Sequence, residues 1–171
     1  IQAIDYDSTV IEITEKYFSN SNLSELNIIN REAKQYISNS LTTNTDILFI
    51  DLFSHGAIPN FFNDIEFYEN CKRNSRSGVI VFNLIIETEN SFKHLMGLIL
   101  SVFNKRCLCL TVADFKNIIV LAFSESCEFE NDVMELRAKC ISLQNSYKIN
   151  FSDLLDEIIM SNECIDNKIK I

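Results

Sequence analysis

Apolar segments of strand length alternate with segments of helical periodicity along almost the whole of this 171-residue chain. The runs "DILFIDLF" (46–53) and "GVIVFNLI" (78–85) are apolar throughout, which is typical of strands buried on both faces. Strands that alternate with helices predict a parallel sheet with right-handed crossovers. The sequence therefore predicts an α/β domain at residues 1–125, with a helical extension at residues 126–171 packed on the same domain.

The individual elements follow from the spacing of apolar residues. The predicted strands are 1–5, 26–29, 46–53, 78–85, 106–112 and 117–123. The predicted helices are 8–18, 31–39, 61–75, 88–103, 129–145 and 151–161. Only "ADFK" separates the last two strands, so we expect them to form an antiparallel hairpin. A mostly parallel Rossmann-like sheet whose last strand turns back is the topology of methyltransferase-like folds.

Charge and composition exclude several classes of function. The net charge of −9 argues against a nucleic-acid surface, which needs clustered Lys and Arg. The apolar runs are too short to span a bilayer, and no signal or transit segment is visible. The six cysteines fall within predicted helices and strands, without the spacing of a zinc site. We therefore expect a cytoplasmic protein with reduced thiols, no metal, and neither a nucleic acid nor a membrane as partner.

Polar side chains follow successive predicted strands at the point where each strand ends. Asp5 closes the first strand, Glu32 follows the second, Asp51 ends the third, and Asn83 lies near the end of the fourth. In open α/β sheets, ligands bind beyond the carboxyl ends of the strands. Each residue also has a structural alternative, because the acids can cap a helix, favour its first turn or bind loop N–H groups. Their shared edge favours a binding crevice.

Several segments resemble the spermidine synthase-like (polyamine aminopropyltransferase) family. "AIDYDSTVIEITEKYF" is similar to the family's acidic strand end and following helix, and "REAKQYI" is similar to its G-D-A-R-x-(F/Y)-(I/L). "DILFIDLFSHGAIPNFF" resembles the stretch D-(V/I)-I-x-x-D-x-F and its Pro-containing loop. "GVIVFNL" matches G-V-x-V-x-N-L. The resemblance covers nearly the whole chain and implies the methyltransferase-like fold.

The resemblance implies roles for particular residues. Asp5 corresponds to the acid that binds the nucleoside ribose, and Glu32, with Ala33 beside it, takes the place of the aspartate that contacts adenine. Asp51 corresponds to the catalytic aspartate. In the family this aspartate positions and deprotonates an amine, which attacks the aminopropyl carbon of decarboxylated S-adenosylmethionine. The implied ligands are therefore S-adenosylmethionine or its decarboxylated form, as substrate, and an amine acceptor.

The chain also departs from the family pattern. Ser54 stands where a second acid grips the diamine, with His55 beside it, and Asn83 stands in place of an active-site Gln. These three residues are the candidate acceptor-binding residues. The first strand and the glycine-rich turn that wraps the cofactor are absent from this sequence. We therefore expect further residues upstream of Ile1 in the complete protein.

Three functions remain open from the sequence. The first is a transferase that moves an aminopropyl or methyl group from the nucleoside to an amine, with a homo-oligomer implied by the family. The second is a catalytically inactive relative that acts as an interaction or regulatory module. The third is a domain that docks a partner through acidic carboxyl-terminal helices carrying Asp153, Asp156 and Glu157.

Overall fold

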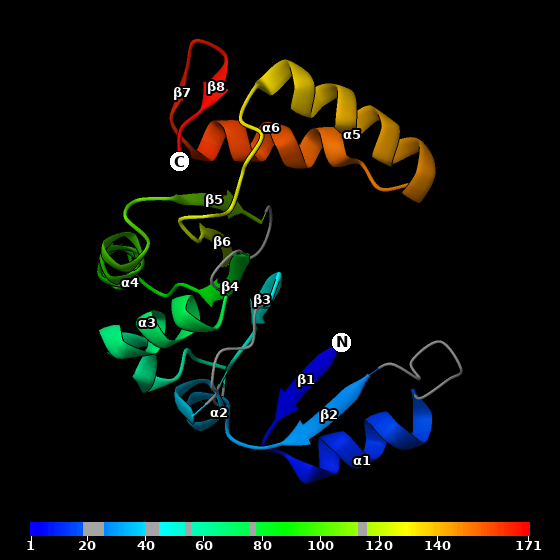
Figure 1. Cartoon of the computed structure of the whole chain (residues 1–171), viewed down its shortest axis with the longest axis vertical. Coiled ribbons are helices and arrows are strands. Elements are labelled where there is room, and N and C mark those ends of the chain that lie inside the picture. The colour runs from blue at the N-terminus through cyan, green and yellow to red at the C-terminus, as the bar shows by residue number, and fades with distance from the viewer. Residues whose placement is uncertain (19–25, 40–44, 54–55, 76–77, 113–115) are drawn as a thin grey trace. The chain divides into compact units, whose positions relative to one another are not determined.

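The computed structural model describes residues 1–18, 26–39, 45–53, 56–75, 78–112 and 116–171. These residues form two compact units, Ile1–Leu41 and Thr42–Ile171, each held together by its own contacts. Figure 1 shows both units with their elements labelled.

Unit one is a parallel strand pair with two helices. Strands β1 (Gln2–Asp5) and β2 (Asn27–Asn30) pair in parallel, with Asp5 opposite Asn30. Helix α1 (Ser8–Tyr17) begins where the Asp7 carboxylate accepts the backbone N–H groups of Thr9 and Val10. Helix α2 (Ala33–Asn39) follows β2. The β–α–β–α order predicted for this part of the chain is confirmed.

Unit two contains a mixed four-stranded sheet in the order β3–β4–β6–β5. Its strands are β3 (Ile47–Ile50), β4 (Val79–Ile85), β5 (Cys107–Thr111) and β6 (Asn117–Phe123). Strands β3 and β4 are parallel, whereas β6 runs antiparallel to both β4 and β5. The predicted hairpin of the last two strands is therefore confirmed, and β6 inserts between β4 and β5.

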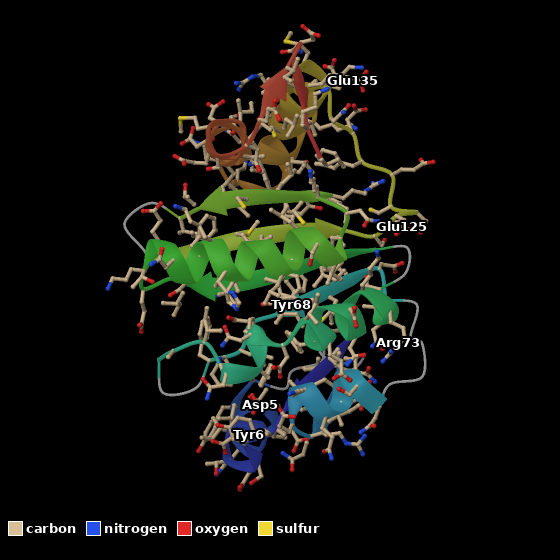
Figure 2. All side chains as sticks on the ribbon, turned by 90° about the vertical axis from the view of Figure 1, so that its left-hand side faces the viewer. Asp5, Tyr6, Tyr68, Arg73, Glu125 and Glu135 are labelled. Carbon is tan, nitrogen blue, oxygen red and sulfur yellow. The ribbon has the colours of Figure 1, made fainter. Side chains whose placement is uncertain are left out.

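One face of this sheet carries an aromatic core. The 3₁₀ turn η2 (Asn60–Asn63) and helices α3 (Ile65–Asn74) and α4 (Glu89–Val102) supply the side chains that pack on β4. Tyr68 is fully buried against Phe82, and its hydroxyl donates to the Phe62 carbonyl at 2.8 Å (Figure 2). The single helix predicted over 61–75 is wrong, because Asp64 is extended and separates η2 from α3.

The opposite face is covered over β5 and β6 by the carboxyl-terminal elements. Helices α5 (Val133–Tyr147) and α6 (Phe151–Ser161) pack side by side, and β7 (Cys164–Ile165) forms a short hairpin with β8 (Lys168–Ile169) (Figure 1). The buried residues of this second core are Leu108, Phe123, Val133, Leu155 and Ile169.

Strand β3 differs from expectation in its burial. Ile50 is only 4% exposed because it faces the aromatic core, whereas Phe49 is 70% exposed and Ile47 51%. Alternate side chains of a strand point to opposite faces. The prediction that this strand is buried on both faces is therefore wrong for the structure described, in which one face of β3 is open.

The ion pair between Lys72 and Glu125 ties α3 to the end of β6. The Lys72 ammonium lies 3.0 Å from Glu125 and also donates to the Val102 carbonyl at the end of α4. Hydrogen bonding and charge attraction from Lys72 lower the pKa of the Glu125 carboxyl, and Asn104 adds a further hydrogen bond. A carboxyl whose pKa is lowered by folding stabilises the protein above its unfolded pKa, and this contribution is lost as the pH falls.

We therefore expect Glu125→Gln to flatten the acid side of the stability profile. Between about pH 5 and about pH 3, the urea midpoint of the wild type should fall more steeply than that of the variant. The exposed neighbour Glu128 is the control, since Glu128→Gln should leave the profile unchanged. Equal pH dependence in the wild type and Glu125→Gln would show that this ion pair contributes nothing.

Candidate functional site

In unit one, the carboxyl ends of β1 and β2 place Asp5 at one edge of the strand pair. Asp5 is half-buried, and its Oδ1 accepts the backbone N–H of Asp7 at 2.8 Å. This bond fixes the carboxylate at the turn into α1, and no hydrogen bond to its Oδ2 is found among the described residues. The neighbouring Tyr6 is 71% exposed (Figure 2). A fixed carboxylate beside an open aromatic ring is suited to a sugar hydroxyl and a stacked base.

Glu32 lies at the start of α2 and is engaged by that helix. Its two carboxylate oxygens accept the backbone N–H groups of Lys34 at 3.0 Å and Gln35 at 2.7 Å. This is the geometry of a helix cap, the structural alternative that the sequence leaves open. A carboxylate has about four acceptor sites, so capping does not prevent a further donor from binding. Ala33 is half-buried as the first residue of α2.

In unit two, the register of β3 and β4 brings Asp51 beside Asn83. Ile50 pairs with Phe82, and both side chains are buried in the aromatic core. The next residue on each strand must then project from the opposite face. Asn83 Nδ2 indeed donates to Asp51 Oδ1 at 2.9 Å. The structure thus brings together two of the four strand-end residues that the sequence predicts to meet.

A third polar residue, Asn117, joins this pair from β6. Its Nδ2 donates to Asn83 Oδ1 at 2.8 Å. From the sequence, Asn117 is predicted only as the start of a strand and not as a site residue. The sequence signal for this role was a polar residue at the end of an otherwise apolar strand. That Asn83 is its neighbour could not be known without the strand order.

A cavity of about 340 Å³ opens at the carboxyl end of β4. Ile85 lines it from the end of β4, and Asn63 of η2 and Leu95 of α4 line it from the elements that pack on the aromatic core. Asn83 is not among its lining residues, because it projects from the opposite face of β4. Glu87 supplies the formal charge among its lining residues, and the first turns of α4 contribute Ser91 and His94. His94, which the sequence gives no special role, is exposed and lines this cavity. Among the described residues, the walls combine a carboxylate with apolar surface and include no Lys or Arg.

Two predicted site residues, Ser54 and His55, lie outside the described residues. Their roles in acceptor binding stay predictions. The loop resumes at Gly56, and Ala57 and Ile58 line the cavity near Glu87.

The remaining reactive groups do not form a second centre. All six cysteines are free thiols, and burial raises the pKa of Cys107 to about 12, so that this thiol stays protonated. Within the described ranges, no group of His, Cys, Asp and Glu side chains has a geometry suited to a metal ion. None of the described helices is long and apolar enough to cross a membrane.

Comparison with solved structures identifies the class of fold. Human methyltransferase-like protein 13, solved in complex with SAH, aligns with a TM-score of 0.74 at 17% identity, over 87% of this chain and 71% of its own. A probable spermidine synthase from Corynebacterium glutamicum aligns with a TM-score of 0.68 at 18% identity, over 84% of this chain and 53% of its own. A spermidine synthase in complex with the transition-state analogue AdoDATO aligns with a TM-score of 0.53 at 14% identity, over 80% and 50%. The fold is therefore that of the methyltransferase-like and spermidine synthase proteins.

Among proteins with this fold, sequence comparison finds similarity to polyamine aminopropyltransferases. A polyamine aminopropyltransferase of Neisseria meningitidis is 27% identical over 162 residues, which are 94% of this chain and 60% of the relative. Another from Chromobacterium violaceum is 23% identical over 94% of this chain and 61% of the relative. No family model matches. These relatives confirm the resemblance to the spermidine synthase-like proteins, although the chain spans only about 60% of their length.

Proposed function

We propose that this protein is a spermidine synthase-like transferase. It binds S-adenosylmethionine or its decarboxylated form and transfers an aminopropyl or methyl group to an amine. The observation that carries the proposal is Asp51, a carboxylate at the carboxyl end of a parallel strand, exposed to an incoming amine and held by Asn83 at 2.9 Å. The named relatives and the solved neighbours with SAH and AdoDATO support the same ligand class.

The proposed chemistry assigns one task to each strand-end carboxylate. Asp5 accepts hydrogen bonds from the hydroxyls of the nucleoside ribose, Glu32 lies near the base, and Tyr6 offers an aromatic surface. Asp51 accepts a hydrogen bond from the acceptor amine, orients its lone pair and takes its proton as the new C–N bond forms. The C–S bond breaks at the same time, and methylthioadenosine leaves when the aminopropyl group is transferred.

The cavity at the carboxyl end of β4, which neither Asp51 nor Asn83 lines, is suited to the distal part of an amine acceptor. Glu87 carries the negative charge that Ser54 cannot provide, and Ile58, Ile85 and Leu95 offer apolar surface for a methylene chain. An ammonium group without a partner would be costly to bring out of water. The charge of this cavity therefore favours a cationic acceptor over an anionic one.

Glu87→Gln is expected to raise the KM for the amine about fivefold, because an exposed charge pair contributes about 1 kcal/mol. The affinity for the nucleoside should not change. Steady-state kinetics with varied amine measures this effect. The neighbouring Glu89, paired with Lys93 at 2.6 Å, is the control, and Glu89→Gln should leave the KM unaltered. An unchanged KM in Glu87→Gln would show that the amine acceptor does not bind in this cavity.

A product assay tests the proposed function itself. The protein is incubated with putrescine and, in separate reactions, with decarboxylated S-adenosylmethionine or S-adenosylmethionine. Chromatography then measures methylthioadenosine or S-adenosylhomocysteine. Formation of either product in proportion to the protein supports the proposal. If neither forms with putrescine or with a panel of longer polyamines and monoamines, the transferase proposal is wrong.

A second candidate, the non-catalytic interaction module, has one observation in its favour. Helix α5 carries large apolar side chains that face solvent, namely Met134, Ile141, Leu143 and Tyr147. Exposed apolar surface of this kind is common where proteins associate. The acidic residues that the sequence offers for docking are each engaged within the protein. Asp156 pairs with Arg137, Glu157 accepts the Thr111 hydroxyl, and Asp153 accepts the Asn150 amide.

A further inference from the structure

Asn117 lies two strands away from Asp51, yet it is connected to it. The strand order β3–β4–β6 places Asn83 between them. In the antiparallel register of β4 and β6, Asn83 is opposite Ile119 and Ile85 is opposite Asn117. All four of these positions project from the same face, since alternate residues of a strand share a face. The three polar side chains therefore form a line across the carboxyl edge of the sheet.

The two hydrogen bonds in this line have one direction. Asn117 Nδ2 donates to Asn83 Oδ1 at 2.8 Å, and Asn83 Nδ2 donates to Asp51 Oδ1 at 2.9 Å. The amide of Asn83 thus accepts on one side and donates on the other. No other hydrogen bond to the Asp51 carboxylate is found among the described residues. Asn83 is therefore the contact that holds Asp51, and Asn117 is the contact that holds Asn83.

The orientation of the Asn83 amide decides its effect on Asp51. An amide can rotate by 180°, which would turn the carbonyl oxygen of Asn83 toward the carboxylate. Two acceptors facing each other repel, and the Asp51 side chain would then leave its position. The donor group of Asn117 disfavours this rotation, because the rotated amide would face Asn117 Nδ2 with its own donor group unless the Asn117 amide turned as well.

Burial makes the Asn117 contact effective. Asn117 and Asn83 are half-buried, whereas Asp51 is exposed. A hydrogen bond shielded from water competes less with solvent and is stronger electrostatically. The half-buried Asn117 is therefore the more rigid end of this row of side chains, and the exposed Asp51 carboxylate is the end that a ligand can reach.

We propose that Asn117 is a positioning residue for Asp51, acting through the amide of Asn83. This rests on the proposed function for its catalytic consequence. With Asn117 in place, Asp51 Oδ1 is held by Asn83 and Oδ2 is left for the acceptor amine. Without it, the amide of Asn83 loses one of the two contacts that fix its orientation, and the carboxylate spends less time in the productive orientation.

The sharpest variant is Asn117→Asp, which keeps the size of the side chain and replaces the donor by an acceptor. Asn83 is then expected to turn its Nδ2 toward residue 117 and its oxygen toward Asp51, which reverses the line. Asn117→Ala removes the contact without reversing it. Asn145→Asp is the control, because it makes the same chemical change at an exposed position of α5.

NMR of the side-chain amides tests the positioning directly. The Asn83 NH₂ signals, assigned by their loss in Asn83→Ala, should shift in Asp51→Ala, because the acceptor is lost. They should shift again in Asn117→Ala and Asn117→Asp and stay unchanged in Asn145→Asp. If Asn117 were only a structural contact, Asp51→Ala would shift the Asn83 NH₂ signals equally in the wild type and in the Asn117→Asp variant. Unchanged Asn83 signals in both Asn117 variants would overturn the proposal.

The kinetic measurement tests the catalytic consequence separately. Asn117→Ala should lower kcat about tenfold, as expected when one hydrogen bond that orients the general base is lost, with the KM for the nucleoside unchanged. Asn117→Asp should lower it further, and Asn117→Ser, which retains a donor, should recover part of the loss. An unchanged kcat would overturn the catalytic role. If the wild type transfers nothing, the proposed function fails, while the amide signals still decide whether Asn117 positions Asp51.

Discussion

Asp51→Asn is expected to lower the rate of group transfer about 10²- to 10⁴-fold. This is the range that a positioned general base contributes, and the amide that replaces the carboxylate cannot accept the proton of the amine. Binding of the nucleoside should remain, since Asp5 and Glu32 belong to unit one. Single-turnover kinetics with saturating nucleoside and amine isolates the chemical step and measures the loss.

The same substitution should leave the stability nearly unchanged. Asp51 is exposed, and an exposed polar substitution usually changes the free energy of unfolding by less than about 0.5 kcal/mol. Asp46→Asn is the matched control, because Asp46 is exposed and precedes the same strand at its opposite end. Its rate should equal that of the wild type. Full activity in Asp51→Asn would show that Asp51 is not the general base of the transfer.

Gly78→Ala is expected to destabilise unit two by about 2–3 kcal/mol, the upper range for inserting a methyl group where no space exists. A Cβ at Gly78 would lie 2.1 Å from the Asp46 carbonyl oxygen and 2.6 Å from that of Thr45. Both are backbone atoms at the entry to the β3–β4 pair, where Val79 N–H donates to the Asp46 carbonyl at 2.9 Å. The strands must therefore separate, and Asp51 and Asn83 would move apart with them.

Gly97→Ala, in the same unit, is expected to raise the free energy of unfolding. Gly97 is exposed within α4, and no heavy atom lies within 4 Å of a Cβ built there. Alanine should therefore stabilise the helix by about 0.5–1 kcal/mol. Urea unfolding of both variants measures the difference. If Gly78→Ala costs less than about 1 kcal/mol, the close approach of the two strands does not constrain the fold.

The six longer strands and the hairpin of the last two of them could be predicted because their sequence signals are local. The turn from Ile50 to Asp51 marks both the end of β3 and a change from the buried to the open face. The short "ADFK" connection excludes a crossover helix, and the β5–β6 hairpin is observed. The length of the connection and the polar residue at the strand end were sufficient to predict these two features.

Other parts depended on details that periodicity does not carry. The apolar pattern continues through Asp64, so the extended backbone that separates η2 from α3 has no signal in the spacing. The β7–β8 hairpin was missed, although Asp166 and Asn167 both have the positive φ typical of its turn. Residues of this kind tolerate that conformation and could have indicated the turn.

The candidate site was predictable only in part. Parallel pairing makes Asp51 and Asn83 neighbours, and the sequence predicts that they meet. Asn117 became visible only with the strand order, because β6 inserts between β4 and β5. For Glu32 the sequence could not separate two roles, because an acid between a strand and a helix can bind a ligand or cap the helix. In the structure its oxygens cap α2.

Calorimetric titration of the protein with methylthioadenosine tests the central claim, that carboxylates at the strand ends hold an adenosine-type ligand. The account predicts saturable binding with one ligand per chain, weakened at least about tenfold in Asp5→Asn, because the ribose hydroxyls lose a charged acceptor. Asp46→Asn should bind as the wild type does. Absence of heat with both methylthioadenosine and S-adenosylmethionine, at several temperatures, would contradict the account.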